Sequence, residues 1–315
     1  MSKTVYHYCS SDTFVSIISN NTLRMTNIKK SNDYTEVINC LNVFQDALKQ
    51  ACLRFKKKFP HDSIFAAFCE NISYENLIEQ AVLNDSLTYY ATCFSEAGDL
   101  LSQWRGYAKD ATGVALGFDT RYLLEMTDYR NMKFMAVEYN AYNVLEDLIY
   151  YIIKKFEHAQ HELKIRGPSV YENAVSAVIS SFVYNAVFYK NPAFSEEQEW
   201  RLVFYPFGNI RNLAIRHRVR DMSTNQLYYD RMLEFVNKEG TYGPFKRKTL
   251  QFGVNRDNIL SYFDLDFSSI APYFVKEIVL GPKNKMDDLD LRLFLLSKGY
   301  NPGNIKIVRS KATYQ

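Results

Sequence analysis

The chain has 315 residues, 47% of them hydrophobic and 23% charged, so it is long enough to bury a sizeable core as one elaborated domain. Its formal net charge of +3 is too balanced to indicate, by charge alone, a protein that binds nucleic acid or a membrane surface. Twelve glycines and eight prolines are too few for a disordered or collagen-like chain. Aromatic residues make up 15% of the sequence, which is the unusual feature of the composition.

The cysteines and the N-terminus indicate a reducing compartment. All five cysteines lie in the first 93 residues, and no Cys-x-x-Cys pair occurs, so we expect reduced thiols rather than disulfides or a zinc site. The first residues lack an apolar stretch of signal-peptide length, which predicts a cytoplasmic protein. The longest uncharged run, 173–189, contains several Asn and Ser residues and predicts a buried helix rather than a membrane span.

The N-terminal third alternates short strands with helices. Strands are predicted over Thr4–Cys9 and Thr22–Thr26, with a helix between them whose apolar residues recur at helical spacing. Ser31, Asn32 and Asp33 supply caps for a long helix that ends in a run of lysines.

The middle of the chain is predicted to be mainly helical. Helical periodicity continues to about Asn84, and a strand rich in Tyr, Thr and Phe follows over Leu87–Ser95. A short helix over Leu100–Lys109 leads into a strand over Thr112–Phe118. Residues 142–189 then predict two antiparallel helices broken by a Gly-Pro pair, which we interpret as a helical hairpin insertion or cap.

The C-terminal part returns to strands. Glu199–Tyr205 is predicted to be a strand with Leu213–Val219 as its partner, and Val275–Leu280 and Ile305–Arg309 are the last strands. A helix over Asp287–Lys298 lies between those two. Strands at both ends and in the middle predict an α+β fold with a mixed or antiparallel central sheet, formed by residues 1–315 as a single domain. The apolar face of the last helix is predicted to carry Leu289, Leu293 and Leu296.

Common catalytic and cofactor motifs are absent from the sequence. There is no Gly-x-Gly-x-x-Gly after a strand, no Walker loop, no Gly-x-Ser-x-Gly elbow and no His-Glu-x-x-His. His158 and His161 have a spacing that can hold a metal, but acidic flanks and the lack of a third ligand favour a surface pair. We therefore expect no metal.

An acidic segment before the strand at Glu199 is the least easily explained by packing. In extended geometry Ser195, Glu197 and Glu199 would share one face, while apolar residues at the alternate positions pack on the other. Carboxylates on the same face repel each other, so a water-exposed strand mouth beside a cleft is expected. Such a carboxylate can steady a developing positive charge. The alternate, packing positions are Trp200, Leu202 and Phe204.

Several motifs in their order along the chain resemble a bacterial family known only as a domain of unknown function. The sequence departs from that family at Tyr34 and in the helical stretch between Tyr142 and Tyr189. The motifs that carry the resemblance are Tyr6-His7-Tyr8, Asn32-Asp33-x-x-Glu36, Cys93-Phe94-Ser95, Trp104-x-x-Tyr107-Ala108, Gly113-x-x-x-Gly117-Phe118 and Glu199-Trp200-Arg201-Leu202.

The first-strand histidine and the late Glu-Trp strand are also similar to the ADP-ribosyltransferase fold. That resemblance implies that His7 binds a ribose hydroxyl of NAD, that Ser95 lies in the middle strand and that Glu199 is the catalytic carboxylate. Glu197 matches the position that orients the acceptor in some members. The remaining residues of the implied NAD site are Tyr89 or Tyr90 as alternatives to Ser95, Arg105 or Arg24 for the pyrophosphate, and Trp104 and Tyr107 as aromatic walls.

The function implied by this resemblance is NAD-dependent transfer of ADP-ribose to a protein or nucleic acid, in bacterial defence or as a toxin. Cleavage of the nicotinamide bond passes through an oxocarbenium-like state, which a fixed carboxylate stabilises without a metal. A basic stretch could hold a nucleic-acid acceptor, although alternation with apolar residues equally describes an ordinary strand. That stretch contains Arg211, Arg216, Arg218 and Arg220.

Two other classes of function stay open. One is a non-catalytic sensor or interaction module of the same fold, in which Glu199 is paired with Arg201 or Arg105 in a closed network and His7 is buried under aromatic rings. The other is a metal-dependent nuclease that uses the carboxylates Asp33, Glu36, Glu197 and Glu199. A cleft shared by His7 and Glu199 would favour the transferase, and their placement on opposite faces of the sheet would argue against it.

Overall fold

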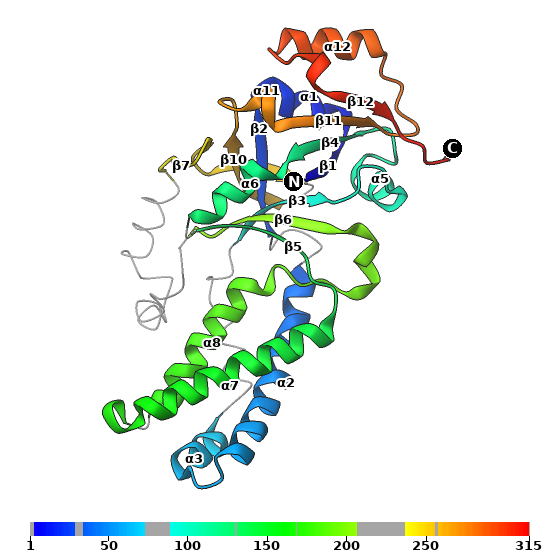
Figure 1. The fold of residues 1–315 in the computed structure, drawn as a ribbon. Helices are drawn as coiled ribbons and strands as arrows, with labels where there is room; N and C mark the ends of the chain where they lie inside the picture. The colour runs from blue at the N-terminus through cyan, green and yellow to red at the C-terminus, as the bar shows by residue number, and fades with distance from the viewer. Residues whose placement is uncertain are drawn as a thin grey trace.

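The computed structural model describes residues 3–28, 34–72, 89–129, 131–167, 169–206, 237–255 and 258–314. A mixed, open β-sheet forms one end of the molecule, and a group of long helices projects from it (Figure 1). The predicted combination of helices with a mixed central sheet is therefore correct.

The sheet follows the order β12-β11-β4-β1-β3-β2-β10-β8-β7. Strand β3 also pairs with β6, β6 with β5, and β10 with β9. The β11–β12 pair is parallel, whereas β3 is antiparallel to β1, β2 and β6. The strands are β1 (Thr4–Cys9), β2 (Thr22–Asn27), β3 (Tyr90–Ser95), β4 (Val114–Asp119), β5 (Met132–Ala136), β6 (Glu199–Phe204), β7 (Gly240–Tyr242), β8 (Phe245–Arg247), β9 (Gln251–Asn255), β10 (Asn258–Asp266), β11 (Val275–Leu280) and β12 (Lys306–Arg309).

Short helices border the sheet, and long ones form the projection (Figure 1). No helix in the described part of the chain is both long enough and apolar enough to cross a membrane. The helices are α1 (Ser11–Asn20), α2 (Tyr34–Lys58), α3 (Ser63–Asn71), α5 (Leu101–Tyr107), α6 (Thr120–Glu125), α7 (Ala141–Arg166), α8 (Val170–Ala186), α11 (Ala271–Phe274) and α12 (Asp288–Ser297), with a 3-10 helix η4 (Pro192–Glu197) before β6.

One face of the sheet packs against a single apolar core, which we call the sheet core. Alternate residues of neighbouring strands enter it, because side chains along a strand point to opposite faces in turn. The other face is covered by two smaller clusters, one around Tyr8 and Trp104 and one around Tyr89 and Val203. Central members of the sheet core are Val5, Phe94, Leu116, Leu202 and Phe263.

The projecting helices α2, α3, α7 and α8 form what we call the helical arm. They pack around their own core, in which Phe55, Phe65, Phe156 and Tyr171 meet mostly edge to face. The segment interpreted as a hairpin insertion or cap supplies α7 and α8. These two helices extend away from the sheet and pack against α2, rather than lying over the sheet (Figure 1). The buried apolar residues of α2 account for this placement, because they pack against α7 and α8 in the core of the arm.

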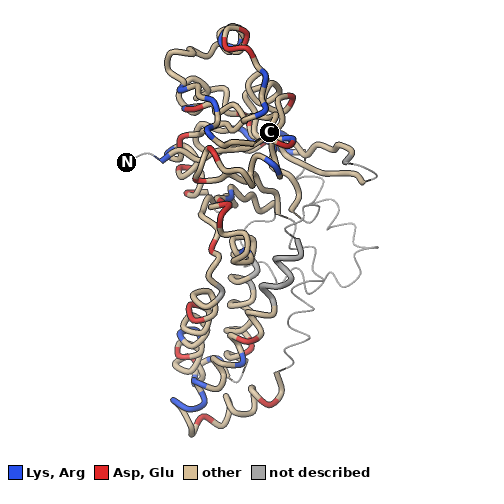
Figure 2. Tube along the Cα trace, turned by 90° about the vertical axis from the view of Figure 1, so that its right-hand side faces the viewer, with Lys and Arg blue, Asp and Glu red and all other residues tan. Residues whose placement is uncertain are grey.

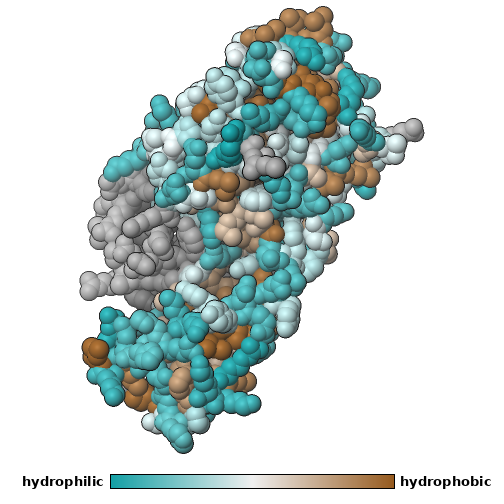
Figure 3. Space-filling view, viewed as in Figure 1, coloured by the Kyte–Doolittle hydropathy of each residue, from teal (hydrophilic) through white to brown (hydrophobic). Residues whose placement is uncertain are grey.

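The last helix packs through a different face from the one predicted. Leu291 and Leu295 are buried, whereas Leu289, Leu293 and Leu296 are 65%, 54% and 57% exposed. Hydrophobic surface is visible at the top of Figure 3, in the region where Figure 1 places α12. The prediction was wrong because leucines occur around most of this helix, so periodicity alone does not select the packing face.

Five strands, β5 and β7–β10, were not predicted. Several predicted features lie outside the described residues and cannot be compared with the structure: the capping residues 31–33, the helical region over 73–84, the strand Leu213–Val219 and the basic stretch 211–220. Charged residues of both signs are interspersed along the sheet and the arm, as Figure 2 shows.

Candidate functional site

The acidic segment before β6 does not continue as an extended strand. Asn191 caps η4, whose first residue is Pro192, and Gln198 then adopts a left-handed backbone with φ of 47°. Glu197 therefore ends a 3-10 helix, while Glu199 begins β6. The prediction that these two carboxylates share a water-exposed strand face is wrong, because the proline and the Asn191 cap favour a turn.

Both carboxylates point instead at one ammonium group. The Lys190 Nζ lies 2.7 Å from Glu197 Oε2 and 3.2 Å from Glu199 Oε2. The Arg201 guanidinium donates to Glu199 twice, through Nε to Oε1 at 2.7 Å and through Nη2 to Oε2 at 2.9 Å. Its Nη1 donates to the Val187 carbonyl at 2.6 Å. We call Lys190, Glu197, Glu199 and Arg201 the Glu199 cluster.

The Glu199 cluster is buried and electrically balanced. Glu199 is 6% exposed and Arg201 is 1% exposed, and the cluster contains two positive and two negative side chains. Burial by itself raises the pKa of Glu199, but the charge and hydrogen bonds of Arg201, the charge of Lys190 and a hydrogen bond from Cys93 lower it to about 2. Glu199 is therefore ionised at neutral pH, and both of its oxygens accept hydrogen bonds from within the protein.

Neighbouring strands hold this cluster in place. Ser95 lies directly opposite Glu199 in the β3–β6 pair, and its hydroxyl donates to the Glu197 carbonyl at 2.7 Å. The Glu199 amide donates to the Tyr139 hydroxyl at 2.9 Å. The structure thus brings Ser95, Glu197 and Glu199 together, and the Ser95 hydroxyl is engaged by the backbone.

His7 lies on the opposite face of the sheet from Glu199. Tyr6 pairs with Ser95, and Ser95 pairs with Glu199, so these three side chains share one face. His7 is the next residue after Tyr6 and therefore points to the other face, where its ring meets Phe94 edge to face. The expected cleft shared by His7 and Glu199 is not present, because the two-residue period of a strand separates them.

The surroundings of His7 are those of a structural residue. Its Nδ1 lies 2.9 Å from the Cys93 carbonyl oxygen. Burial lowers the pKa of His7, and the hydrogen bond to Cys93 opposes that effect only in part. A neutral imidazole bonded to the backbone of β3 helps to join β1 and β3 at the point where they diverge.

The aromatic residues predicted to line an NAD pocket are dispersed. Tyr90 belongs to the sheet core and hydrogen-bonds Ser261 at 3.1 Å, whereas Tyr89 packs against Tyr205 on the other face. Trp104 is fully buried, and its indole nitrogen donates to Asp99 at 2.7 Å. These rings do not line one cleft, because each is committed to a different packing cluster.

The cationic candidates for a pyrophosphate are also apart. Arg105 is exposed, with its guanidinium 5.8 Å from the ring of Tyr314, and Tyr107 is 53% exposed. Arg24 donates to Asp264 at 3.1 Å and stacks 3.6 Å above the ring of Tyr262. These contacts of the two guanidinium groups are therefore with residues outside the Glu199 cluster.

Metal-ligating side chains do not gather in the described residues. No group of three or more His, Cys, Asp or Glu side chains in those parts of the chain is arranged to hold a metal ion. His158 and His161 are both exposed on α7, as expected for a surface pair, and His158 Nε2 lies 3.6 Å from Glu162 Oε1. Asp33 lies outside the described residues, and the side chain of Glu36 is not described, so the nuclease carboxylates cannot be compared.

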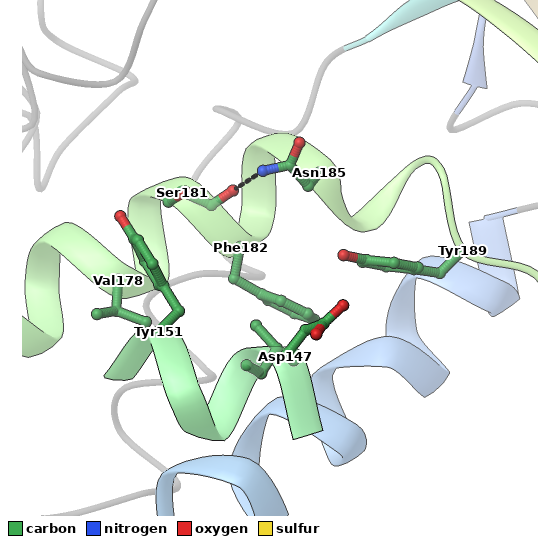
Figure 4. Close-up of a pocket in the computed structure, with 8 residues that line it drawn as sticks. Asp147, Tyr151, Val178, Ser181, Phe182, Asn185 and Tyr189 are labelled. Carbon is green, nitrogen blue, oxygen red and sulfur yellow. Dashed lines mark hydrogen bonds between the residues drawn. The ribbon is translucent and has the colours of Figure 1, made fainter. Parts of the chain in front are cut away.

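Sequence reasoning missed a pocket between α7 and α8, at the end of the arm nearest the sheet. Its volume is about 210 Å³. Figure 4 shows Asp147 and Tyr151 reaching it from α7, and Ser181, Phe182 and Asn185 from α8. Asp147 and Tyr151 are four residues apart and share a helical face, which is the only local signal for it. The remaining lining residues are Leu148, Val178 and Tyr189.

Residues 103–202 match a protein family described as a protein of unknown function (DUF2971). This match supports the resemblance to an uncharacterised family and runs from α5 through the helical pair α7–α8 to β6. It therefore includes the Glu199 cluster and the pocket, but neither His7 nor Ser95. No curated protein and no solved structure matches the chain.

Proposed function

We propose that this protein is a non-catalytic interaction module, in which the residues expected to bind NAD stabilise the sheet. The observation that carries this proposal is that the Glu199 carboxylate is already bound by side chains of the protein itself. Its two carboxylate oxygens accept hydrogen bonds or ion pairs from Arg201 and Lys190 inside a buried, neutral cluster. A carboxylate that steadies an oxocarbenium-like state must instead face the space that the ribose occupies.

The separation of His7 from Glu199 supports the same proposal. An ADP-ribosyltransferase-like site needs both side chains at one cleft, and here they occupy opposite faces of the sheet. The implied transferase activity, with NAD as substrate and a protein or nucleic acid as acceptor, would therefore require the β-strands to pair in a different register. A shift of one residue in register moves every side chain of the strand to the other face of the sheet, so the buried apolar residues would be exposed.

The helical arm supplies the surface suited to a partner. It projects from the sheet, and its exposed side includes Tyr142 and Tyr150, which are 68% and 66% exposed (Figure 1). Tyrosine is enriched at protein interfaces, because it offers a large rigid contact with one polar end. The Glu199 cluster is buried within the sheet region, whereas the arm exposes aromatic rings. This arrangement fits a scaffold that presents a binding surface.

The test is to measure NAD binding and nicotinamide release by the purified protein, together with unfolding of Glu199→Gln. We expect no NAD binding, no nicotinamide release and a loss of stability in the variant. Glu196→Gln is the matched control, since Glu196 is exposed and lies outside the cluster. Nicotinamide release that Glu199→Gln abolishes without unfolding would overturn the proposal in favour of ADP-ribosyl transfer.

A further inference from the structure

The pocket at the base of the arm combines an available charge with aromatic walls. In Figure 4 the Asp147 carboxylate and the Tyr189 hydroxyl point to the space beside the ring of Phe182, and the ring of Tyr151 stands at the other side. Asp147 is exposed and makes no hydrogen bond or ion pair within the part of the chain that the structure describes. Among the described residues that line the pocket, it is the only charged one.

This arrangement suits a planar organic cation. A guanidinium group can donate two parallel hydrogen bonds to a carboxylate and stack on an aromatic face at the same time. We propose that the pocket binds an arginine side chain of a partner protein, with Asp147 as the anionic ligand and Tyr151 as a stacking surface. The proposal rests on the proposed function, because it names the partner-binding site of the interaction module.

The size of the pocket favours a single side chain. Pockets that enclose a whole small ligand usually measure about 300–1,000 Å³, whereas this one has about 210 Å³. Tyr150 lies beside Asp147 on the outer side of α7 and is 66% exposed, so contact can continue beyond the pocket. An arginine within a protein chain would use both the pocket and this surrounding surface.

The wall on α8 is held rigidly. The Asn185 amide donates to the Ser181 carbonyl at 2.7 Å, and its oxygen contacts the Lys133 ammonium group. Lys133 lies 5.2 Å from the ring of Phe188, and burial lowers its pKa. A fixed wall reduces the ordering cost of binding.

The experiment titrates the whole protein with the blocked peptide acetyl-Gly-Arg-Gly-amide by calorimetry at low ionic strength. The matched ligand replaces arginine with citrulline, which has the same shape but no charge. We expect the arginine peptide to bind at least about tenfold more tightly than the citrulline peptide, since the charge-assisted pair is lost in the latter. Equal binding of the two peptides, or binding of neither, overturns the proposal.

Variants locate the site. Asp147→Asn is expected to abolish the preference for arginine, and Tyr151→Ala to weaken binding several-fold. Glu172→Gln is the control, because Glu172 is an exposed carboxylate on α8 that does not line the pocket. Unchanged arginine binding by Asp147→Asn would place the ligand elsewhere and contradict the assignment.

Two further outcomes separate the possible failures. Tighter binding of free arginine than of the blocked peptide would identify a small-molecule site and overturn the assignment to a partner protein. The NAD measurements use a different ligand and the Glu199→Gln variant. A negative peptide titration with no NAD turnover therefore rejects this pocket alone, whereas NAD turnover rejects the interaction-module proposal.

Discussion

The sheet and the helical arm place their acidic side chains in contrasting environments. Glu199 is 6% exposed and is bound by two cations, whereas Asp147 is exposed at the mouth of a pocket without a partner among the described residues. The sequence motif drew attention to the first and not to the second. The contrast teaches that an unusual cluster of charges can be a structural lock, while a single unpaired charge beside aromatic rings is better placed to bind a ligand.

Removing Arg201 should cause the largest loss of stability, because it breaks the buried ion pair of the Glu199 cluster. Arg201→Ala leaves the Glu199 carboxylate buried without its guanidinium partner, and breaking a buried pair in this way costs about 3–5 kcal/mol. Urea unfolding of the variant measures this loss. Arg54→Ala is the control, because Arg54 pairs with Glu146 at the surface of the arm and should cost no more than about 1 kcal/mol. Similar losses for the two variants would contradict the contrast between sheet and arm.

Within α12, replacing a buried leucine should cost much more stability than replacing an exposed one. Leu295→Ala is expected to lower stability by about 2–5 kcal/mol, because Leu295 is fully buried in the sheet core. Leu293→Ala, at an exposed position two residues away, should change it by no more than about 0.5 kcal/mol. Thermal or urea unfolding of the two variants measures these losses. A larger loss for Leu293→Ala than for Leu295→Ala would support the packing face predicted from the sequence.

Acid should open the Glu199 cluster. The pKa of Glu199 is about 2 in the folded protein and 4.5 ordinarily. Its ionisation therefore stabilises the fold fully above about pH 5, and this contribution is lost as the pH falls toward 2. At about 1.4 kcal/mol per pKa unit, the difference corresponds to about 3 kcal/mol.

The pH dependence of unfolding for the wild type and Glu199→Gln measures this contribution. Other carboxylates with lowered pKa values, such as Asp99 and Asp119, titrate in both proteins and cancel in the comparison. The variant should lose less stability than the wild type between pH 5 and pH 2. Parallel curves would mean that Glu199 is not held as an ion by its neighbours.

The smallest effect is expected at the pocket. Asp147→Asn should change the free energy of unfolding by no more than about 0.5 kcal/mol, because the side chain is exposed and unpaired in the described residues. Urea unfolding checks this value. A loss of more than 1–2 kcal/mol, on the scale of a buried polar contact, would mean that Asp147 is part of the packing of the arm.

Local periodicity predicted the elements whose packing depends on nearby residues. The apolar residues of α1 that recur at helical spacing, Phe14, Ile17 and Ile18, are buried as predicted. Leu202 and Phe204 also face the core as the alternation along the strand predicts. These predictions succeed because a helix or strand repeats its pattern within a few residues.

Strands outside this pattern were harder to predict. In β10, the buried residues Phe263 and Leu265 alternate with Asp264, but polar residues interrupt the rest of the strand. Its existence depends on pairing with β2, far away in the sequence. A strand of this kind needs a partner that the local sequence does not reveal.

The sequence alone determined the main helices, the alternation of β1, β3, β4 and β6, and the list of charged residues that a site could use. Only the tertiary structure decided which charged side chains are buried in ion pairs and which are exposed and available to a ligand. The register of β1, β3 and β6 separates His7 from Glu199, and the pairing of α7 with α8 leaves Asp147 beside Tyr151. Burial and charge pairing depend on contacts between distant segments, so they are properties of the fold and not of a local motif.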